Sequence, residues 1–379
     1  MLFRSARRFL FLSKAALVAA RHAPERVDIV HAHDWQAAML PLLVHHARVT
    51  GGWANAPRTL FTIHNLAYQG VFPVEAWGDT GLPWSWFHLE SAAHDGGVNF
   101  LKAGLCLADA LSTVSPRYAR EVCTREYGCG LDGVLRRREH DLCGILNGVD
   151  YGEWNTTSNP ALPHPFDARD LGGKALDKVA LQREMGLQDD LGTPLFSNVS
   201  RLADQKGCDL ILGAVERLIA SRPFQFALLG SGDPVLERGF RALAARFPGR
   251  VAARIGFDPA LAHRIEAGSD FYLMPSRFEP CGLNQLYSLR YGTVPVVRAT
   301  GGLADSVVDA RDDADGATGI HFHEPSVAAL SWAIQKALAL HASPEAMAHY
   351  RHNGMNRDFS WATQAIEYVK FYGEILHGP

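Results

Sequence analysis

Residues 271–305 read FYLMPSRFEPCGLNQLYSLRYGTVPVVRATGGLAD, and this stretch decides the fold class. The short apolar run 271–274, closed by Pro275, is typical of a buried strand, and residues 282–291 have the apolar spacing of a helix. Residues 294–297 repeat the strand pattern, and the glycine pair at 301–302 opens a second helix. Both loops therefore follow the carboxyl end of a strand, which is the edge where a parallel sheet binds its ligands.

The first of these loops carries Arg277 and Glu279, and two interpretations of the pair are open. A carboxylate beside an arginine forms a structural salt bridge more often than it acts in catalysis. The second loop favours a functional role, because Gly301 and Gly302 leave backbone N–H groups approachable at a helix start, where phosphate or another anion binds. The two loops together favour an anion site with a carboxylate beside it.

Strand and helix patterns alternate through the second half of the chain, with strands expected at 195–199, 224–229, 251–255, 271–274 and 294–297. Such alternation predicts a parallel sheet with helices on both faces. The first loop of this series contains Arg201 and Lys206, whose positive charges suit a diphosphate. A solvated basic turn is the alternative interpretation of the same residues. Gly230 closes the next strand and is a weak signal by itself.

The first half shows the same alternation, with strands expected at 27–32, 58–64, 110–114 and 143–146. We place the domain boundary at 188–193, which gives a first domain over residues 1–190, a second over 191–359 and a last helix over 360–379. His31 and His33 share one face of a strand and could bind a metal, but the spacing suggests no third ligand, so no metal site is expected. The aromatic-rich residues 77–94 predict either a sugar-binding lip or a cluster packed for stability.

Five motifs carry a family resemblance. They are SRFEPCGLNQLY at 276–287, RATGGLAD at 298–305, HDWQ at 33–36, HNLAYQG at 64–70 and NGVD at 147–150. Together they resemble the bacterial glycogen synthases and plant starch synthases, which are retaining glycosyltransferases that use ADP-glucose. The resemblance covers the chain from about Arg8 to the last helix. It implies the α/β GT-B architecture, in which two Rossmann-like domains face a central cleft and the last helix crosses back onto the first domain.

The resemblance also implies substrates and residue roles. ADP-glucose and an α-1,4-glucan (glycogen or starch) would be the partners, and no cofactor is expected because ADP-glucose is itself a substrate. Arg201 and Lys206 would hold the donor diphosphate. Glu279 would bind glucose hydroxyls and stabilise the cationic sugar, and His64 would contact the same sugar. The other donor-side candidates are Asn147, Gly230, Phe257, Cys281, Gly282, Leu283, Thr300, Gly301 and Gly302, and the acceptor-side candidates are Asp34, Trp35, Tyr68 and Gln69.

Composition and charge make nucleic-acid and membrane partners unlikely. The 379 residues carry a formal net charge of -3 without a basic stripe, so no nucleic-acid partner is expected. The chain has no apolar run near the roughly 20 residues that span a bilayer, so no membrane partner is expected either. The six cysteines include no Cys-x-x-Cys pair and are expected to be reduced thiols in a cytosolic compartment. We expect a bacterial cytoplasm rather than a plastid.

The N-terminus departs from the family pattern. Family members begin with a strand followed by Lys-x-Gly-Gly-Leu-x-Asp, and nothing before Val27 supplies this motif. Residues 1–23, basic and free of acids, resemble either a transit peptide or an amphipathic helix separated from what preceded it. We therefore expect a first domain without its initial strands, weak ADP binding, negligible synthase activity and a tendency to aggregate. The alternatives are an inactive fragment, a glucan- or nucleotide-binding pseudoenzyme, and another nucleotide-sugar transferase resembling sucrose synthase.

Overall fold

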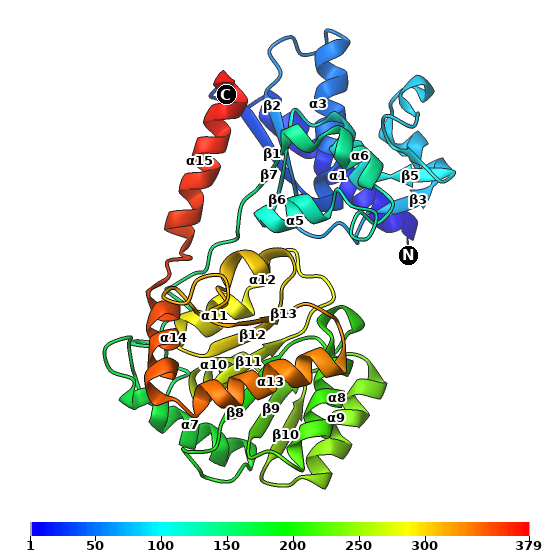
Figure 1. Cartoon of the computed structure of the whole chain (residues 1–379). Helices are drawn as coiled ribbons and strands as arrows, with labels where there is room; N and C mark the ends of the chain where they lie inside the picture. The colour runs from blue at the N-terminus through cyan, green and yellow to red at the C-terminus, as the bar shows by residue number, and fades with distance from the viewer. Residues whose placement is uncertain (1, 379) are drawn as a thin grey trace. The chain divides into compact units, whose positions relative to one another are not determined.

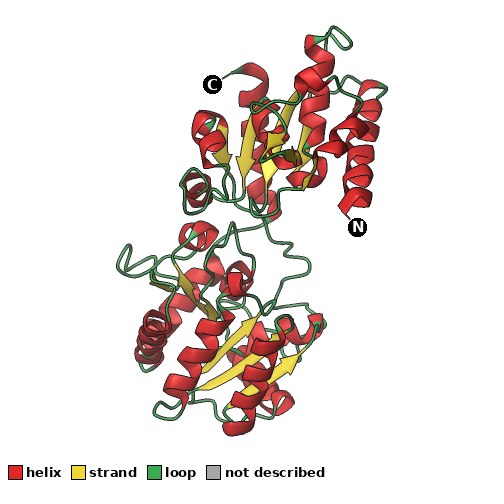
Figure 2. Ribbon diagram, turned by 90° about the vertical axis from the view of Figure 1, so that its right-hand side faces the viewer, coloured by secondary structure: helices red, strands yellow, loops and turns green. Residues whose placement is uncertain are grey.

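The computed structural model describes residues 2–378, with side chains from Ser5 onward, and divides into two compact units. Unit 1 contains the residues up to Leu146 together with those from Gln364 onward, and unit 2 contains Asn147–Thr363 (Figure 1). In each unit a parallel sheet has helices on both faces (Figure 2), which is the α/β arrangement that the sequence predicts.

Unit 1 is built on a four-stranded parallel sheet with the order β1-β2-β6-β7. Its strands are β1 (Ile29–His33), β2 (Arg58–Ile63), β6 (Ala110–Thr113) and β7 (Leu142–Gly144). Its helices are α1 (Leu2–Arg21), α2 (Asp34–Ala37), α3 (Met39–Val49), α4 (Phe100–Leu107), α5 (Pro116–Glu121), α6 (Asp132–Arg137) and, from Gln364 onward, α15 (Trp361–His377). Strand β2 is buried along five of its six residues, because both faces of a central parallel strand are covered.

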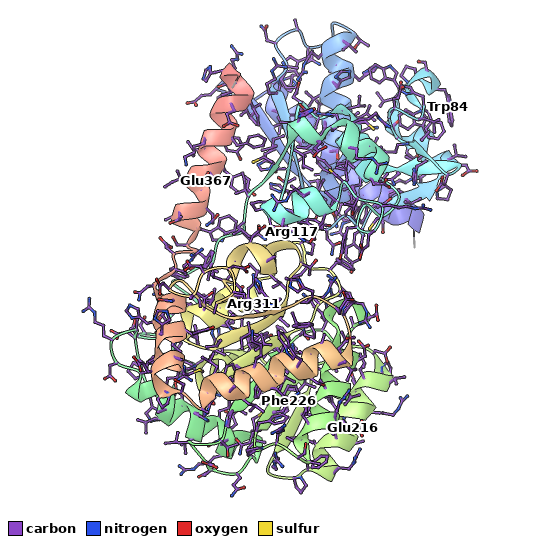
Figure 3. The ribbon with its side chains drawn as sticks, viewed as in Figure 1. Trp84, Arg117, Glu216, Phe226, Arg311 and Glu367 are labelled. Carbon is purple, nitrogen blue, oxygen red and sulfur yellow. The ribbon has the colours of Figure 1, made fainter. Side chains whose placement is uncertain are left out.

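The aromatic-rich excursion of unit 1 forms short elements of its own. It contains the 3₁₀ helices η1 (Val74–Thr80) and η2 (Trp84–Trp86) and a small antiparallel sheet with the order β3-β5-β4, made of β3 (Val71–Pro73), β4 (Ala93–His94) and β5 (Gly97–Asn99). A third 3₁₀ helix, η3 (Glu139–Asp141), precedes β7. Trp77 is fully buried and lies beside Phe87, whereas Trp84 is 59% exposed (Figure 3). Part of the aromatic cluster is therefore packed for stability, and part reaches solvent.

Unit 2 is built on a six-stranded parallel sheet with the order β10-β9-β8-β11-β12-β13. Its strands are β8 (Leu195–Val199), β9 (Gln225–Gly230), β10 (Val251–Ile255), β11 (Phe271–Met274), β12 (Val294–Arg298) and β13 (Ile320–Phe322). Its helices are α7 (Gly172–Met185), α8 (Cys208–Ile219), α9 (Pro234–Arg246), α10 (Pro259–Gly268), α11 (Asn284–Arg290), α12 (Gly301–Ser306), α13 (Val327–His341) and α14 (Pro344–Asn356), with the 3₁₀ helix η4 (Asp204–Lys206). Phe226 of β9 lies in the main core cluster (Figure 3).

The strand order of unit 2 reverses between β8 and β11. From β8 the chain proceeds outward through β9 and β10, whereas β11, β12 and β13 follow one another on the other side. In open parallel sheets the loops on either side of such a reversal separate and leave a crevice at the carboxyl edge. The loops that follow β8 and β11 are therefore the expected walls of a ligand site.

The boundary between the units differs from the one expected at 188–193. Residues 147–190 belong to unit 2, because their side chains pack onto its helices. The Trp154 ring stacks on Tyr287 of α11 with centroids 3.6 Å apart, Phe166 packs in a cluster with Tyr291, and α7 packs against α10. Residues 147–190, which the sequence assigns to the end of the first domain, thus belong to unit 2.

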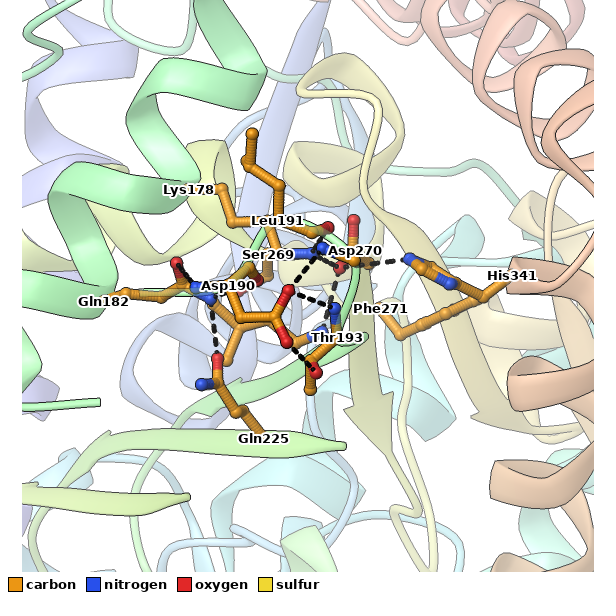
Figure 4. Close-up of polar contacts among 12 residues, drawn as sticks. Lys178, Gln182, Asp190, Leu191, Thr193, Gln225, Ser269, Asp270, Phe271 and His341 are labelled. Atoms are coloured by element: carbon orange, nitrogen blue, oxygen red, sulfur yellow. Dashed lines mark hydrogen bonds and ion pairs between the residues drawn. The ribbon is translucent and has the colours of Figure 1, made fainter. Parts of the chain in front are cut away.

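A buried polar network ties together the amino-terminal ends of β8 and β11 (Figure 4). Asp270, just before β11, accepts hydrogen bonds from Lys178 Nζ of α7 (2.7 Å), the Leu195 N–H (2.8 Å) and Arg351 Nη2 of α14 (2.7 Å). Burial alone would raise the pKa of the Asp270 carboxyl, but the Lys178 and Arg351 charges hold this pKa below its usual value. The network fixes the two strands whose opposite ends carry the candidate site.

Within the described residues, no helix combines the length and apolarity needed to cross a membrane.

Replacing Asp270 by asparagine should lower the free energy of unfolding by about 3–5 kcal/mol, because it leaves two buried cations without their counter-charge. The pKa of Asp270 is depressed in the fold, so its contribution is present above the unfolded-state pKa of about 4 and is lost as the pH falls below it. Urea titrations at pH 7 measure the change. The exposed Asp315→Asn is the matched control, and equal stability of the two variants would contradict the role given to the network.

Candidate active site

The loops after β8 and β11 meet through an ion pair. The Lys206 Nζ lies 2.6 Å from Glu279 Oε2, and Ser276 Oγ donates to the same oxygen at 2.9 Å. Glu279 is only 5% exposed, and the side chain of Lys206 is 21% exposed. A carboxylate so far from solvent is stabilised by its ammonium partner and its hydroxyl donor, because neither charge alone would tolerate the loss of water.

Arg277, the sequence neighbour of Glu279, takes a different partner. Its guanidinium binds both carboxylate oxygens of Asp209 on α8 at 2.8 Å and donates to the Asp204 carbonyl at 2.7 Å. The salt bridge that the sequence allows at this loop therefore forms between Arg277 and Asp209, and Glu279 is left to pair with Lys206. The bidentate arginine holds the β11 loop against the loop that carries Lys206.

Two glycines let the loop after β12 approach the β11 loop closely. Gly301 has φ +45, and a Cβ there would lie 1.9 Å from the Glu279 carbonyl oxygen. A Cβ on Gly302 would lie 2.1 Å from the Cys281 carbonyl oxygen, and the Gly302 N–H instead donates to the carbonyls of Glu279 and Pro280 at 3.1 Å each. The sequence correctly places Gly301 and Gly302 at the start of a helix, and the close packing explains why a side chain cannot stand there.

The other donor-side candidates lie in or beside the loop after β11. Gly282 adopts φ +72, and Leu283 lies at the start of α11 and is 36% exposed. Thr300 is buried at the start of α12. Cys281 is buried, and burial raises the pKa of its thiol to about 12, while the Asn147 backbone acts against this rise through a hydrogen bond. Asn147 and Cys281 are thus neighbours in unit 2, although 134 residues separate them in the chain (281 − 147).

A cavity of about 280 Å³ opens beside these loops in unit 2. Arg201 and Gly230 line it, as do Phe257, which is 91% exposed, and the stacked pair Trp154 and Tyr287. Aromatic rings and the cationic residue Arg201 therefore both line the cavity. A flat aromatic group joined to an anion would fit such a lining.

In unit 1 the candidate residues lie at the carboxyl ends of β1 and β2. His64 follows β2, and its backbone N–H donates to Asp34 Oδ1 at 2.8 Å. Asp34 follows β1 and has φ 52, a left-handed conformation that is rare outside glycine. The same Asp34 oxygen accepts from the Asn65 N–H at 3.4 Å. Asp34, expected at the acceptor side, therefore also fixes the backbone of the His64 loop.

The side chain of His64 is held by a second histidine. The His64 Nε2 and His33 Nδ1 atoms are 3.0 Å apart, and the His31 ring lies against His33 with centroids 4.1 Å apart. His31 itself contacts Tyr372 OH at 2.8 Å and Thr62 Oγ1 at 2.6 Å. Burial and the two neighbouring histidines lower the pKa of His31 to about 3, and burial followed by His64 lowers the pKa of His33. Among the described residues, no group of three or more His, Cys, Asp and Glu side chains is placed to hold a metal ion.

The other acceptor-side candidates differ in how far their side chains are engaged in contacts within the protein. The Trp35 ring packs against Phe9 (centroids 4.8 Å apart) and Phe72 (5.8 Å) and lies over Gly70, where a Cβ would come within 2.4 Å of it. The Gln69 amide donates to the Cys129 carbonyl at 2.8 Å and accepts from Asn99 at 2.6 Å. Tyr68 is 53% exposed. Tyr68 is therefore open to a ligand, whereas the Trp35 ring and the Gln69 amide make structural contacts.

Sequence reasoning missed three contributors to these sites. Ser276 lies inside the decisive loop, but nothing in its spacing shows that its hydroxyl reaches Glu279. Trp154 lies in the range 1–190 that the sequence assigns to the first domain, and the available signal is the tryptophan itself, since a large aromatic side chain outside a helix or strand usually packs against other residues. In the sequence, His33 is a possible metal ligand with His31 and the first residue of the HDWQ motif. Its contact with His64 joins two neighbouring strands and is invisible in the sequence.

Comparison with known proteins defines the class of enzyme. Residues 2–137 match the starch synthase catalytic domain, and residues 186–354 match the glycosyl transferases group 1. The catalytic domain of starch synthase IV from Arabidopsis thaliana, bound to ADP and acarbose, matches with a TM-score of 0.90 and 34% identity over 98% of this chain and 78% of that one. A sucrose-phosphate synthase from Thermosynechococcus elongatus shares the fold, with a TM-score of 0.63 and 18% identity over 100% of this chain and 80% of that one. The protein is a glycosyltransferase of the GT-B fold.

Curated relatives define the family within this class. The glycogen synthase of Myxococcus xanthus is 49% identical over 98% of this chain and 76% of its own length. That of Anaeromyxobacter dehalogenans is 50% identical over 99% of this chain and 78% of its own length. The chain belongs to the glycogen synthase family.

The close approach of the Gly301 backbone to Glu279 predicts that a side chain at position 301 destabilises the protein. Gly301→Ala should lower the free energy of unfolding by about 1–3 kcal/mol or more, because the new Cβ meets the Glu279 carbonyl and the backbone is left-handed. Chemical denaturation measures this loss. The matched control is Gly133→Ala in α6, where nothing lies within 4 Å of the new atom, and equal behaviour of both variants would refute the role of the close packing.

Proposed function

We propose that the chain transfers glucose from ADP-glucose to the non-reducing end of an α-1,4-glucan, with retention of configuration and without a metal or other cofactor. The observation that carries the proposal is the ion pair between Lys206 and Glu279 at the reversal of strand order in unit 2. The glycogen synthase family gives the polymer, and the related starch synthase IV, solved with ADP and acarbose, supports an adenine nucleotide and a glucan-like ligand. We also propose a bacterial cytoplasmic location.

The cations of the β8 loop would bind the donor diphosphate. Lys206 and Arg201 lie at the two ends of the loop between β8 and α8, and Arg201 is exposed on the wall of the 280 Å³ cavity. Negative charge grows on the diphosphate as the bond to the sugar breaks. Cations fixed in place before that moment stabilise the departing group more than solvent can, because they need no reorganisation.

Glu279 would act on the sugar. As the C1–O bond to the diphosphate breaks, positive charge develops on the glucose ring, and a carboxylate beside it lowers the energy of this state. The same carboxylate accepts hydrogen bonds from sugar hydroxyls. The acceptor hydroxyl then forms the new bond to C1 on the face that the diphosphate leaves, and its proton passes to the departing phosphate. This route retains the configuration and requires no separate strong base.

The aromatic wall of the cavity would hold the nucleobase. Tyr287 and Trp154 are stacked 3.6 Å apart with their planes at 4°, and Phe257 stands exposed at the edge. A purine can lie against such rings through stacking and apolar contact. In unit 1, His64 would contact the transferred glucose, while Asp34 and Tyr68 would accompany the acceptor glucan.

The first test is the reaction itself. Incubation with ADP-glucose and a maltooligosaccharide should give elongated glucan, with UDP-glucose a poorer donor, and the new anomeric proton should show the α configuration by NMR. An absence of elongation would instead support the negligible activity that the N-terminal sequence predicts. Glu279→Gln should keep the fold and ADP binding yet lose transfer, because it removes charge where the sugar becomes cationic. The Myxococcus xanthus relative with the matching change is the parallel sample. Near-normal turnover in that variant, or equal use of UDP-glucose, would contradict the respective part of the proposal.

The second test concerns the diphosphate. Lys206→Ala should weaken ADP binding about 10- to 100-fold, since one charge-assisted hydrogen bond contributes roughly 1.5–3 kcal/mol. Calorimetric titration of the whole chain with ADP measures this loss, and a thermal melt checks that the variant is folded. Lys370→Ala is the matched control, because Lys370 is an exposed lysine of α15 paired with Glu367. Unchanged ADP affinity in Lys206→Ala would remove Lys206 from the donor site.

A further inference from the structure

His33 and His64 form a pair whose geometry leaves little freedom to either ring. The two nitrogens, His33 Nδ1 and His64 Nε2, are 3.0 Å apart, and the ring centroids are 5.2 Å apart. One hydrogen must lie between these nitrogens, so one imidazole donates and the other accepts. Because Nε2 of His64 is engaged by His33, Nδ1 is the nitrogen left for a ligand.

We propose that His33 is a positioning residue that fixes the ring orientation and tautomer of His64, so that His64 presents Nδ1 to the transferred sugar. This inference rests on the proposed role of His64 in glucosyl transfer. His33 acts through His64 and needs no contact with the substrate. Asp34, the next residue, holds the His64 backbone N–H at 2.8 Å, so two consecutive residues at the end of β1 fix both the backbone and the side chain of His64.

The conformation of Asp34 supports a functional reason for this arrangement. A left-handed φ of 52 at a non-glycine residue carries a conformational cost, and such residues gather at functional sites where the surrounding structure holds them. The strained residue directly follows His33 and is the first residue of α2. It lets the chain leave β1 with the His33 ring and the Asp34 carboxylate both directed at the loop after β2.

The position of the His33 ring is in turn fixed by contacts with His31. The His31 ring lies against it, and His31 is held by Tyr372 of α15 and by Thr62 of β2. Tyr372 OH lies 2.8 Å from His31 Nδ1, and Thr62 Oγ1 lies 2.6 Å from His31 Nε2 and 2.5 Å from Ser112 Oγ, so both nitrogens of the His31 ring are engaged. The C-terminal helix therefore contributes, through His31, to the placement of the His33–His64 pair.

The test combines ring spectra with turnover. In the wild-type chain, ¹⁵N–¹H correlation spectra should show His64 as a single tautomer with its Nε2 in a hydrogen bond. His33→Ala should mix the two His64 tautomers and lower kcat about 2- to 10-fold, the range of one neutral hydrogen bond, with a smaller change in the KM for ADP-glucose. His33→Asn should restore most of both properties, because the asparagine amide can reach the place of Nδ1. His22→Asn, an exposed histidine at the end of α1, is the matched control.

The outcomes separate this inference from the proposed function. Wild-type His64 spectra and turnover in His33→Ala would overturn the inference, as would a failure of His33→Asn to do better than His33→Ala. Unchanged turnover in His64→Ala would instead contradict the role of His64 in the proposed function. In that case the ring spectra would still decide whether His33 holds His64.

Discussion

The ion pair between Lys206 and Glu279 joins the two loops at which the strand order of unit 2 reverses. A reversal leaves the carboxyl edge of a parallel sheet open, so the loops there need contacts of their own to keep a defined shape. The buried Glu279 carboxylate provides one, through Lys206 and Ser276. Lys206 is also the cation that we propose for the donor diphosphate, so the contact that shapes these loops includes a residue of the proposed donor site.

Much of unit 2 serves this edge. Asp270 fixes the opposite ends of β8 and β11, and Arg277 fixes the β11 loop to α8 through Asp209. The Gly301 backbone approaches so closely that no side chain could stand between the β11 and β12 loops. Rigid support of this kind lets a few charges act in catalysis, because preorganised groups lose little energy to rearrangement during the reaction. Unit 1 has similar support at the end of β1, where His33 contacts the ring of His64 and Asp34 binds its backbone N–H.

The sequence predicts the strands of unit 2 well and the contacts between its loops poorly. The expected bounds of β8, β10 and β11 match the structure, because buried parallel strands are short continuous apolar runs. Strand β13 and the small sheet of β3, β4 and β5 escaped notice, since elements of two or three residues have no periodicity to read. Arg277 and Glu279 are near neighbours in the sequence but do not pair with each other. Their partners, Asp209 and Lys206, lie about 70 residues away in the chain. Family resemblance gives the candidate site residues, whereas only coordinates could show that Trp35 and Gln69 make structural contacts and that His33 contacts His64.

A crystal structure of the chain with ADP would give the decisive distance, the one from Lys206 Nζ to the nearest phosphate oxygen. We predict that ADP lies in the cavity beside Trp154 and Tyr287 and that Lys206 Nζ lies within hydrogen-bond distance, about 2.7–3.2 Å, of a phosphate oxygen. Glu279 would remain beside it, facing the place of the sugar. A complex in which the phosphates bind elsewhere, with Lys206 still bound to Glu279 alone, would show that Lys206 does not bind the donor diphosphate.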